Sequence, residues 1–436
     1  MWTGTALAVA LPDTVEQVAA LVRWCAVNCV HVIPQGGNTG MSGGATPPED
    51  GVNLVIALTR LNRIRAIDPV NNTMSVDAGV ALAKVQEVAL EAGRFFPLSL
   101  AAEGSCTIGG NLATNAGGTA VLRYGNAREL CLGLEVVTPI GEIWDGLRGL
   151  RKDNSGYDLR DLFIASEGTL GIITGAVLKL FPKPAARLAA LVCVESCDAA
   201  MALLGSLRAR HADRLTAFEL ASRDCLELVF RHAGARDPFG ASYPWYVLVE
   251  FTDFVSEDDA RQAIEVALGE AFEAGLIVDA VIAESLAQSQ ALWSLREGIS
   301  EAQSAEGATI KHDIAVPLSA IAAFVPAAIA AVAARHPDIR PVVFGHLGDG
   351  SLHFNYSPAI GETKAAFLQR QKDVNDIVHD LTIKAGGTIS AEHGLGVLRR
   401  DEADAYRKDP ERRMMLAIKQ ALDPQGIMNP GKLLVR

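Results

Sequence analysis

The spacing of apolar residues predicts both helices and strands in the first part of the chain. In DTVEQVAALVRWCAVNC, apolar side chains recur three and four residues apart at Val15, Val18, Ala19 and Val22, which predicts an amphipathic helix with a capping pattern at Asp13. The short apolar runs HVIP, VNLVIAL and TMSVDAG are typical of strands, and ALAKVQEVALEAG is typical of a helix. LEVVTPIGEIWDG predicts a hairpin. This part should be mixed α/β.

Prolines in FPKPAARLAA, residues 181–190, suggest a domain boundary. Beyond them LAALVCV, PWYVLVEF and LIVDAVIA alternate with helical stretches, which predicts an open sheet with helices against one face. The tail from about residue 361 is mostly helical. We therefore expect an α+β protein with domains at 1–183 and 184–360 and a C-terminal helical segment at 361–436.

PVVFGHLGDGSLHFNYSP, residues 341–358, predicts two short strands joined by a glycine-rich turn. The period of two in a strand places His353 and Asn355 on one face and Phe354 and Tyr356 on the other. The turn could be a dinucleotide loop, part of a metal site or an ordinary hairpin.

Charge and cysteine content narrow the functional classes. Among 436 residues there are 39 basic and 51 acidic side chains, a net charge of -12, and no basic run, so nucleic acid is not an expected partner. The seven cysteines form no CxxC pair and are expected to be reduced core residues of a cytoplasmic protein. MWTGTALAVAL lacks the basic region of a signal peptide and is too short to span a bilayer, so neither a signal peptide nor a transmembrane segment is expected.

Three loops rich in glycine and small polar residues lie in the first domain, at residues 34–44, 102–118 and 166–174. Loops of this composition let the backbone approach a ligand and direct N–H groups at phosphate oxygens. The G-x-G-x-x-G pattern of a Rossmann fold is missing: its nearest match is Gly348, Gly350 and then His353, followed by a strand rather than a helix. The dinucleotide interpretation of the 341–358 turn therefore fails.

A metal site at this turn remains open on spacing alone. His346 and His353 flank the turn, and Glu392 and His393 lie in a second glycine-rich turn, SAEHGLG. Two imidazoles and a carboxylate are a ligand set that suits catalytic Zn²⁺ and also Mn²⁺ or Co²⁺. A histidine in a turn is, however, more often a surface or hydrogen-bonded residue than a ligand.

The motifs PQGGNTGMSGG, GSCTIGGNLATNAGG, LRKDNSGYDLRDLFIASEGTLGIIT, GHLGDGSLHFN and ISAEHGLGVLRRD resemble, in order and spacing, those of the FAD-linked D-2-hydroxyacid dehydrogenases. These belong to the vanillyl-alcohol-oxidase-like flavoproteins, and the likeness is greatest to the D-2-hydroxyglutarate dehydrogenases, from about residue 5 to the C-terminus. The resemblance implies a PCMH-type FAD-binding domain at 1–183, a substrate domain at 184–360 and a C-terminal segment that completes the FAD and metal sites. Compared with that family the chain is a few dozen residues short at its start. Some wider relatives tether FAD through a histidine where this chain has Thr39, so dissociable FAD is expected.

The resemblance also implies the cofactor-binding residues of the three loops and the tail. They are Pro34, Gly36, Gly37, Asn38, Thr39, Gly40, Ser42, Gly104, Ser105, Gly109, Gly110, Asn111, Thr114, Asn115, Gly117, Glu167, Gly168, Gly171, Ile172 and Asn429.

The family's metal ligands correspond to His346, His353 and Glu392. His393 is a candidate general base that removes the hydroxyl proton; the alternative is that it only orients Glu392. The family's substrate-binding residues correspond to Arg296, Ser300 and Lys311, and Asn355 is expected to contact the proximal carboxylate. Without the family, an arginine on a helix face would be read as solvated.

The expected reaction is oxidation of a D-2-hydroxy acid, preferably D-2-hydroxyglutarate to 2-oxoglutarate, by metal-assisted deprotonation and hydride transfer to FAD. D-malate and D-lactate are alternative substrates. Ser300 stands where the most similar members of the family have threonine, which leaves the exact length of the substrate open. Electrons should pass to an electron-transfer flavoprotein or a quinone, and the resemblance suggests a homodimer. Two other functions stay open: the flavin subunit of a glycolate or D-lactate oxidase complex, and a non-catalytic metal- or nucleotide-binding module.

Overall fold

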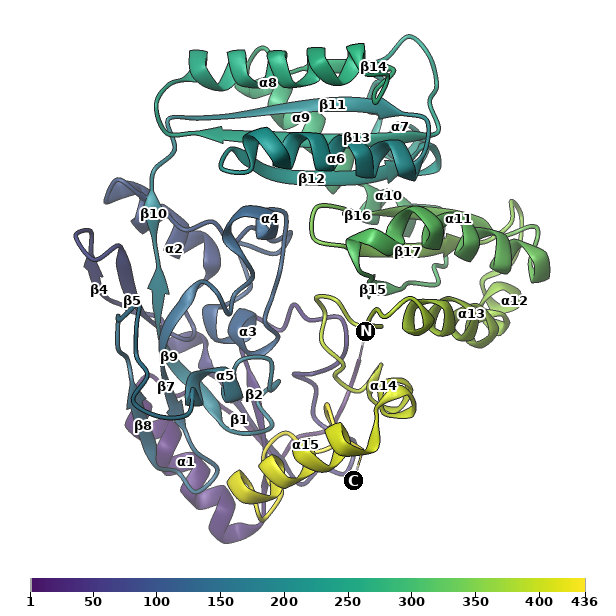
Figure 1. Ribbon diagram of the computed structural model, residues 1–436. Helices are drawn as coiled ribbons and strands as arrows, with labels where there is room; N and C mark the ends of the chain where they lie inside the picture. The colour runs from purple at the N-terminus through teal and green to yellow at the C-terminus, as the bar shows by residue number, and fades with distance from the viewer. Residues whose placement is uncertain (1, 436) are drawn as a thin grey trace. The chain divides into compact units, whose positions relative to one another are not determined.

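The computed structural model describes residues 2–435 and divides the chain into two compact units (Figure 1). Unit 1 contains residues 1–118, 124–183 and 392–436, and unit 2 contains residues 119–123 and 184–391. The chain thus leaves unit 1 after Lys183, where the prolines suggested a boundary. Residues 361–391 pack with unit 2, and the remainder of the tail packs with unit 1.

The described part of unit 1 holds ten strands in three sheets. Its strands are β1 (Ala8–Ala10), β2 (His31–Gln35), β3 (Asn53–Ala57), β4 (Ile64–Asp68), β5 (Thr73–Asp77), β6 (Arg94–Phe95), β7 (Cys131–Val137), β8 (Ile143–Gly146), β9 (Ile172–Lys179) and β10 (Phe181–Pro182). Its helices are α1 (Val15–Asn28), α2 (Leu82–Glu91), α3 (Ile108–Ala113), α5 (Leu159–Phe163), α14 (Arg400–Tyr406) and α15 (Asp409–Leu422), with a 3₁₀ turn at Leu58–Arg60; α4 (Val121–Tyr124) crosses the unit boundary.

The sheets of unit 1 are a parallel β1-β3-β2 sheet, an antiparallel β4-β5-β9-β7-β8 sheet and the short β10-β6 pair. The β7-β8 hairpin forms where the sequence predicts it, with Gly141 at a φ of 78° in the turn. The predicted helix is α1, but its cap is one residue later than predicted. The Thr14 hydroxyl, rather than Asp13, accepts the N–H of Gln17, and the Gln17 side chain accepts the N–H of Asp13.

The C-terminal segment is built into unit 1 beside β2. Val32 donates its N–H to the carbonyl of Ile427, and its carbonyl accepts the N–H of Asn429, both at 2.8 Å. The buried Lys419 ammonium donates to the carbonyl of Met428 at 3.0 Å, which fixes the same segment to α15. The tail therefore reaches the loop that follows β2.

Unit 2 is a seven-stranded antiparallel sheet with helices. Its strands are β11 (Ala186–Val194), β12 (Leu215–Ser222), β13 (Trp245–Asp253), β14 (Asp279–Ile282), β15 (Asp313–Ala315), β16 (Arg340–His346) and β17 (Ser351–Ser357), in the order β14-β11-β13-β12-β16-β17-β15. Its helices are α6 (Cys197–His211), α7 (Arg223–Ala233), α8 (Glu257–Glu273), α9 (Leu286–Glu297), α10 (Ile299–Glu306), α11 (Leu318–Arg335), α12 (Lys364–Gln369) and α13 (Gln371–Lys384).

Helices cover both faces of this sheet, so the prediction of a single covered face is wrong. Helices α6, α8, α11 and α13 pack on one face around residues such as Phe218 and Phe354. Helices α7, α9 and α10 pack on the other around Tyr246 and Phe344 (Figure 1). The central strands are accordingly apolar on both faces. A charged residue buried between this sheet and a helix is therefore unusual and calls for an explanation.

Helix α11 is the one described helix that is long and apolar enough to cross a membrane by composition. Core helices meet the same criterion, and α11 contributes Ile321, Phe324, Val325 and Val332 to the core of unit 2. Packing in the core accounts for part of its apolar character, since 28 % of the helix is buried.

Candidate functional site

The first glycine-rich loop of unit 1 leaves β2 with its backbone N–H groups unused. Gln35 donates from its side chain to the carbonyl of Ala45 at 3.0 Å, which closes the loop at its base. Within the described residues, the N–H groups of residues 36–40 donate no hydrogen bond, and Asn38 has a left-handed φ of 54°. Consecutive unpaired N–H groups of this kind form a concave site for anions.

The first and second loops approach each other closely enough to require glycine. A Cβ on Gly37 would lie 1.8 Å from the carbonyl oxygen of Ser105, and one on Gly36 would lie 2.2 Å from the hydroxyl of Thr107. Two polar groups at this contact are buried without a partner in the described chain: the hydroxyl of Thr107 and the side-chain amide nitrogen of Asn111. Buried polar groups are normally paired, so these two fit a bound polar ligand.

The third loop supplies Glu167, a buried carboxylate in a left-handed conformation with a φ of 50°. Burial raises the pKa of Glu167, and the N–H groups of Leu395 and Gly396, each 2.8 Å away, act against that rise. Asn429 donates its side-chain amide to the carbonyl of Glu167 at 2.6 Å. Backbone strain of this kind persists where the surrounding contacts impose it.

Glu167 and Ser42 together hold the turn that carries His393. Ser42 donates its hydroxyl to the carbonyl of Gly394 at 2.9 Å and accepts the N–H of Val397 on its own carbonyl, also at 2.9 Å. A Cβ on Gly394 would meet the Glu167 carboxylate at 2.9 Å. The turn is therefore fixed to the first and third glycine-rich loops, and His393 lines the same cleft as they do.

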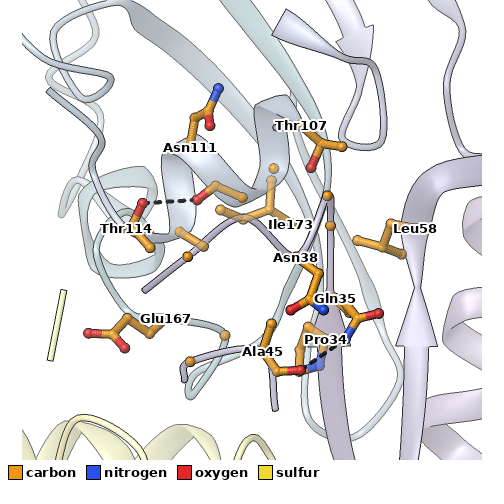
Figure 2. Close-up of a pocket in the computed structure, with 18 of the residues that line it drawn as sticks. Pro34, Gln35, Asn38, Ala45, Leu58, Thr107, Asn111, Thr114, Glu167 and Ile173 are labelled. Carbon is orange, nitrogen blue, oxygen red and sulfur yellow. Dashed lines mark hydrogen bonds between the residues drawn. The ribbon is translucent and has the colours of Figure 1, made fainter. Parts of the chain in front are cut away.

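The three loops line a cleft that is open to solvent and contains about 970 Å³ of space when the solvent-filled part is included (Figure 2). Of the predicted cofactor-binding residues, the cleft is lined by Pro34, Gly36, Gly37, Asn38, Thr39, Gly40, Ser42, Gly109, Gly110, Asn111, Thr114, Glu167, Gly168, Gly171 and Ile172. Gly104, Ser105, Asn115, Gly117 and Asn429 do not line it; Ser105 and Asn429 instead contact residues that do.

Sequence reasoning missed Gln35, Gly44, Ala45, Leu58, Cys106, Thr107, Ala113, Ser166 and Ile173 in this cleft. All but Ala45 and Leu58 lie inside the three predicted loops, and Ala45 directly follows the first, so a prediction that included every residue of each loop would have found most of them. Leu58 comes from the 3₁₀ turn after β3, and no local pattern marks it. The unused N–H groups, the unpaired Thr107 and Asn111 and the close glycine contacts fit a large ligand with phosphate groups, such as FAD.

In unit 2, the 341–358 turn forms a hairpin that brings two histidines together. Gly345 and Gly350 have φ of 152° and 91°, and a Cβ on Gly350 would meet the carbonyl of Val316 at 2.4 Å. The ring centroids of His346 and His353 are 6.0 Å apart, and a ligand nitrogen of each lies within 4.8 Å of the other. That separation suits two ligands of one cation.

Asp349 shapes the same turn, since its carboxylate accepts the N–H of Ser351 at 2.9 Å. Asp313 pairs with His353 across β15 and β17, and their ligand atoms also lie within 4.8 Å of each other. An acidic group beside an imidazole favours binding of a cation.

Arg296 reaches the His346 side of the sheet through a carboxylate that sequence reasoning missed. Glu219 on β12, with 2 % of its surface exposed, binds Nδ1 of His346 at 2.8 Å and accepts from Nε of Arg296 at 2.9 Å. The guanidinium also lies over the ring of Phe344, 4.8 Å from its centroid. The sequence feature that could have identified Glu219 is a single glutamate inside the apolar strand TAFEL, because an ionisable residue in a buried strand is rare.

The other predicted substrate residues differ in burial. Arg296 and Ser300 lie on successive helices, α9 and α10. Gly298 between the two helices keeps right-handed helical angles, so Ser300 stays about one turn from Arg296, and it is exposed. Lys311 is half-buried, and burial lowers its pKa. Asn355 is buried; its amide donates to the Gln303 side chain at 3.0 Å and its oxygen accepts the N–H of His312 at 3.1 Å.

Glu392 opens the last segment of unit 1, where its carboxylate accepts the N–H of Gly118 at 3.2 Å. It directly follows Ala391, whose N–H donates to the carbonyl of Asp313 at 3.2 Å inside unit 2. Chain connectivity therefore keeps Glu392 within one residue of a segment bonded to β15.

Comparison with known proteins agrees with this geometry. A family model described as the C-terminal domain of FAD-linked oxidases matches residues 183–433, and a model of an FAD-binding domain matches residues 6–146. A D-2-hydroxyglutarate dehydrogenase of Xanthomonas citri pv. viticola is 42 % identical over 99 % of this chain and 90 % of its own length. The mitochondrial D-2-hydroxyglutarate dehydrogenase of Arabidopsis thaliana is 38 % identical over 99 % of this chain and 76 % of its own.

Among solved structures, the 4-ethylphenol oxidase of Gulosibacter chungangensis aligns with a TM-score of 0.72 at 19 % identity, covering 98 % of this chain and 89 % of that one. This likeness supports the predicted α+β fold with a PCMH-type FAD-binding domain. The chain belongs to the FAD-linked oxidases, among their D-2-hydroxyacid dehydrogenases.

Proposed function

We propose that the protein oxidises a D-2-hydroxy acid to the 2-oxo acid with non-covalently bound FAD and a divalent cation, and that D-2-hydroxyglutarate is its preferred substrate. The observation that carries the proposal is the pairing of a two-histidine cluster with Arg296 on one face of the unit 2 sheet. That pairing combines a cation site with an anion-binding guanidinium, as a chelating hydroxy acid requires. The names of the related dehydrogenases support the choice of substrate.

His346, His353 and Glu392 would hold the cation. Two imidazole nitrogens and one carboxylate are a donor set suited to Zn²⁺, with Mn²⁺ and Co²⁺ as alternatives, and they leave a position for substrate. When bound, the cation would act as a Lewis acid that lowers the pKa of the substrate hydroxyl. The ligand nitrogens of His346 and His353, both in unit 2, lie within 4.8 Å of each other, and the family resemblance assigns Glu392 as the third ligand.

His393 would accept the hydroxyl proton. It belongs to the turn fixed by Ser42 and Glu167 and lines the FAD cleft, so its ring is held where the cofactor would lie. An imidazole is suited to accept a proton near neutral pH. FAD bound in the cleft supplies the hydride acceptor. Thr39 in the first loop offers no imidazole for a covalent link, which supports dissociable FAD.

Arg296, Ser300, Lys311 and Asn355 would hold the substrate. Arg296 presents its Nε and Nη2 to Glu219, which leaves both Nη1 hydrogens for a carboxylate. Two cationic side chains, Arg296 and Lys311, favour a dicarboxylate over lactate or glycolate. We also propose an electron-transfer flavoprotein or a quinone as the electron acceptor. A cytoplasmic location would fit the free cysteines of the described chain, and the family resemblance suggests a homodimer.

The proposal is tested by mixing the FAD-loaded protein anaerobically with a panel of D- and L-2-hydroxy acids and following loss of flavin absorbance, before and after chelation. We expect D-2-hydroxyglutarate to bleach the flavin fastest, L-enantiomers to be inert and a chelator to stop the reaction. His346→Ala should abolish bleaching and retain FAD. His336→Ala is the matched control, because His336 pairs with Asp373 at the end of α11, and it should react normally. Equal bleaching by L-enantiomers, or indifference to chelation, would contradict the proposal.

A further inference from the structure

Glu219 is a buried carboxylate that lies between the proposed cation site and the proposed anion site. It belongs to neither the cation ligands nor the substrate-binding residues proposed above. One oxygen, Oε1, lies 2.8 Å from Nδ1 of His346, and the other, Oε2, lies 2.9 Å from both Nε and Nη2 of Arg296. Its side chain is 1 % exposed, and those of His346 and Arg296 are 9 % and 11 % exposed. One side chain therefore fixes a group in each half of the site.

The chemistry of a carboxylate determines what each contact does. An ionised carboxylate only accepts hydrogen bonds, so the hydrogen of a neutral His346 is assigned to Nδ1. The lone pair is then on Nε2, the nitrogen that would bind a cation. A carboxylate placed behind a metal-binding imidazole in this way fixes the ring's tautomer and orientation.

The same carboxylate orients Arg296. Its two contacts on one edge of the planar guanidinium, together with the Phe344 ring beneath, leave one rotational position for the group. The Nη1 edge is then directed by Glu219 rather than by solvent. Loss of the Glu219 charge would release Arg296 and His346 together.

Burial of this charge is costly and calls for a functional reason. A buried ion pair often contributes little net stability compared with apolar residues of similar volume, because both charges lose their hydration. The sheet holds a second example, Glu250 on β13, which is 3 % exposed and binds Arg187 and the indole N–H of Trp293 on α9. Glu250 anchors the same helix as Glu219 but has neither histidine as a hydrogen-bond partner, which makes it a structural comparison within the same protein.

We propose that Glu219 is a positioning residue that couples the two halves of the site: it presents Nε2 of His346 to the cation and the Nη1 edge of Arg296 to the substrate carboxylate. The inference rests on the function proposed above. Its consequence is that one substitution, at a residue that touches neither cation nor substrate, weakens both kinds of binding.

The test compares Glu219→Gln with Glu250→Gln in the FAD-loaded protein. Zn²⁺ affinity is measured by competition with a chromophoric chelator, and KM for D-2-hydroxyglutarate is measured in saturating Zn²⁺. Glu219→Gln should weaken Zn²⁺ binding by about 10- to 100-fold. It should also raise KM by about 10-fold or more, because a charged hydrogen bond that orients Arg296 is lost. Glu250→Gln should leave both values within about 2-fold of wild type, since its partners lie outside the site.

Glu219→Asp keeps the charge but shortens the side chain by one methylene, so it should show both losses in smaller degree and carries the test if Glu219→Gln does not fold. Wild-type affinity and KM in both variants overturn the inference, as does a loss confined to one of the two measurements. Equal losses in Glu219→Gln and Glu250→Gln would show that Glu219 only holds helix α9 in place, and this result would also overturn the inference. If the wild-type protein itself binds no Zn²⁺, the proposed function fails, and that outcome is distinct from either of the others.

Discussion

The two proposed binding regions of this protein are built from different parts of the polypeptide. The FAD cleft of unit 1 is formed mainly by backbone, with unused N–H groups at residues 36–40 and glycines that let the loops touch. The face of the unit 2 sheet is formed by side chains, among them Glu219, His346 and His353, each placed by its strand. A site formed by backbone should tolerate changes in the surrounding side chains, but it should not tolerate a Cβ added at a glycine where two loops touch. A side-chain site should show the opposite behaviour, so the two regions can be disrupted separately.

The largest effect is expected from His353→Ala. It removes a proposed ligand of the cation, so turnover of D-2-hydroxyglutarate should fall by more than about 100-fold, the upper end of the loss seen when only a residue behind a ligand is changed. FAD content, measured by absorbance after gel filtration, should equal that of wild type because the cleft of unit 1 is untouched. Loss of FAD together with turnover would show that the two regions are not separable.

The converse change is Gly37→Ala. Its Cβ would lie 1.8 Å from the carbonyl oxygen of Ser105, so the first and second loops must move apart. Overpacking of this kind costs about 1–3 kcal/mol, and we expect FAD affinity to fall by about 10- to 100-fold while Zn²⁺ affinity is retained.

Gly104→Ala is the matched control, because a Cβ at Gly104 has no atom within 4 Å and Gly104 does not line the cleft. It should bind FAD as wild type does, in a titration of the apoprotein followed by flavin fluorescence. Equal FAD loss in both variants would mean that the loops need mobile glycines rather than close contact.

The same contrast explains what could be predicted from the sequence. The cleft was predictable because its glycine-rich loops are contiguous motifs, and most predicted loop residues line it. The hairpin of β16 and β17 was predictable from alternation, and His353 and Asn355 do share a face, opposite the core residues Phe354 and Tyr356. Both features are local in sequence.

What the sequence did not reveal depends on contacts between distant segments. Glu219 becomes a partner of His346 and Arg296 only because β12 pairs with β16 and α9 packs across them. The cover of both sheet faces depends on which helices return to which side, and each helix taken alone is compatible with either. The shift of the α1 cap to Thr14 reflects two competing cap residues one position apart.

Lys311 gives a smaller effect that depends on pH. Burial lowers its pKa, so its positive charge is lost at a lower pH than that of an exposed lysine, and the substrate carboxylate then loses a partner. KM for D-2-hydroxyglutarate should therefore rise as pH increases through this lowered pKa. Lys311→Met should raise KM by about 10- to 100-fold at neutral pH, as loss of a charged hydrogen bond would, and remove the rise. Lys311→Arg should keep KM low in alkaline buffer, and an unchanged alkaline rise in that variant would assign the effect to another group.

The smallest effect is expected at Thr107, where the backbone cleft does use a side chain. Its hydroxyl is buried and has no partner in the described chain, so Thr107→Val should leave the melting temperature of the apoprotein unchanged or raise it. FAD affinity should fall by up to about 10-fold, the value of one neutral hydrogen bond. Thr174→Val is the control: the Thr174 hydroxyl donates to Glu135 at 2.9 Å and does not line the cleft, so this variant should lower the melting temperature and leave FAD affinity unchanged. If Thr107→Val instead behaves like Thr174→Val, the hydroxyl is structural, and the cleft recognises its ligand through backbone alone.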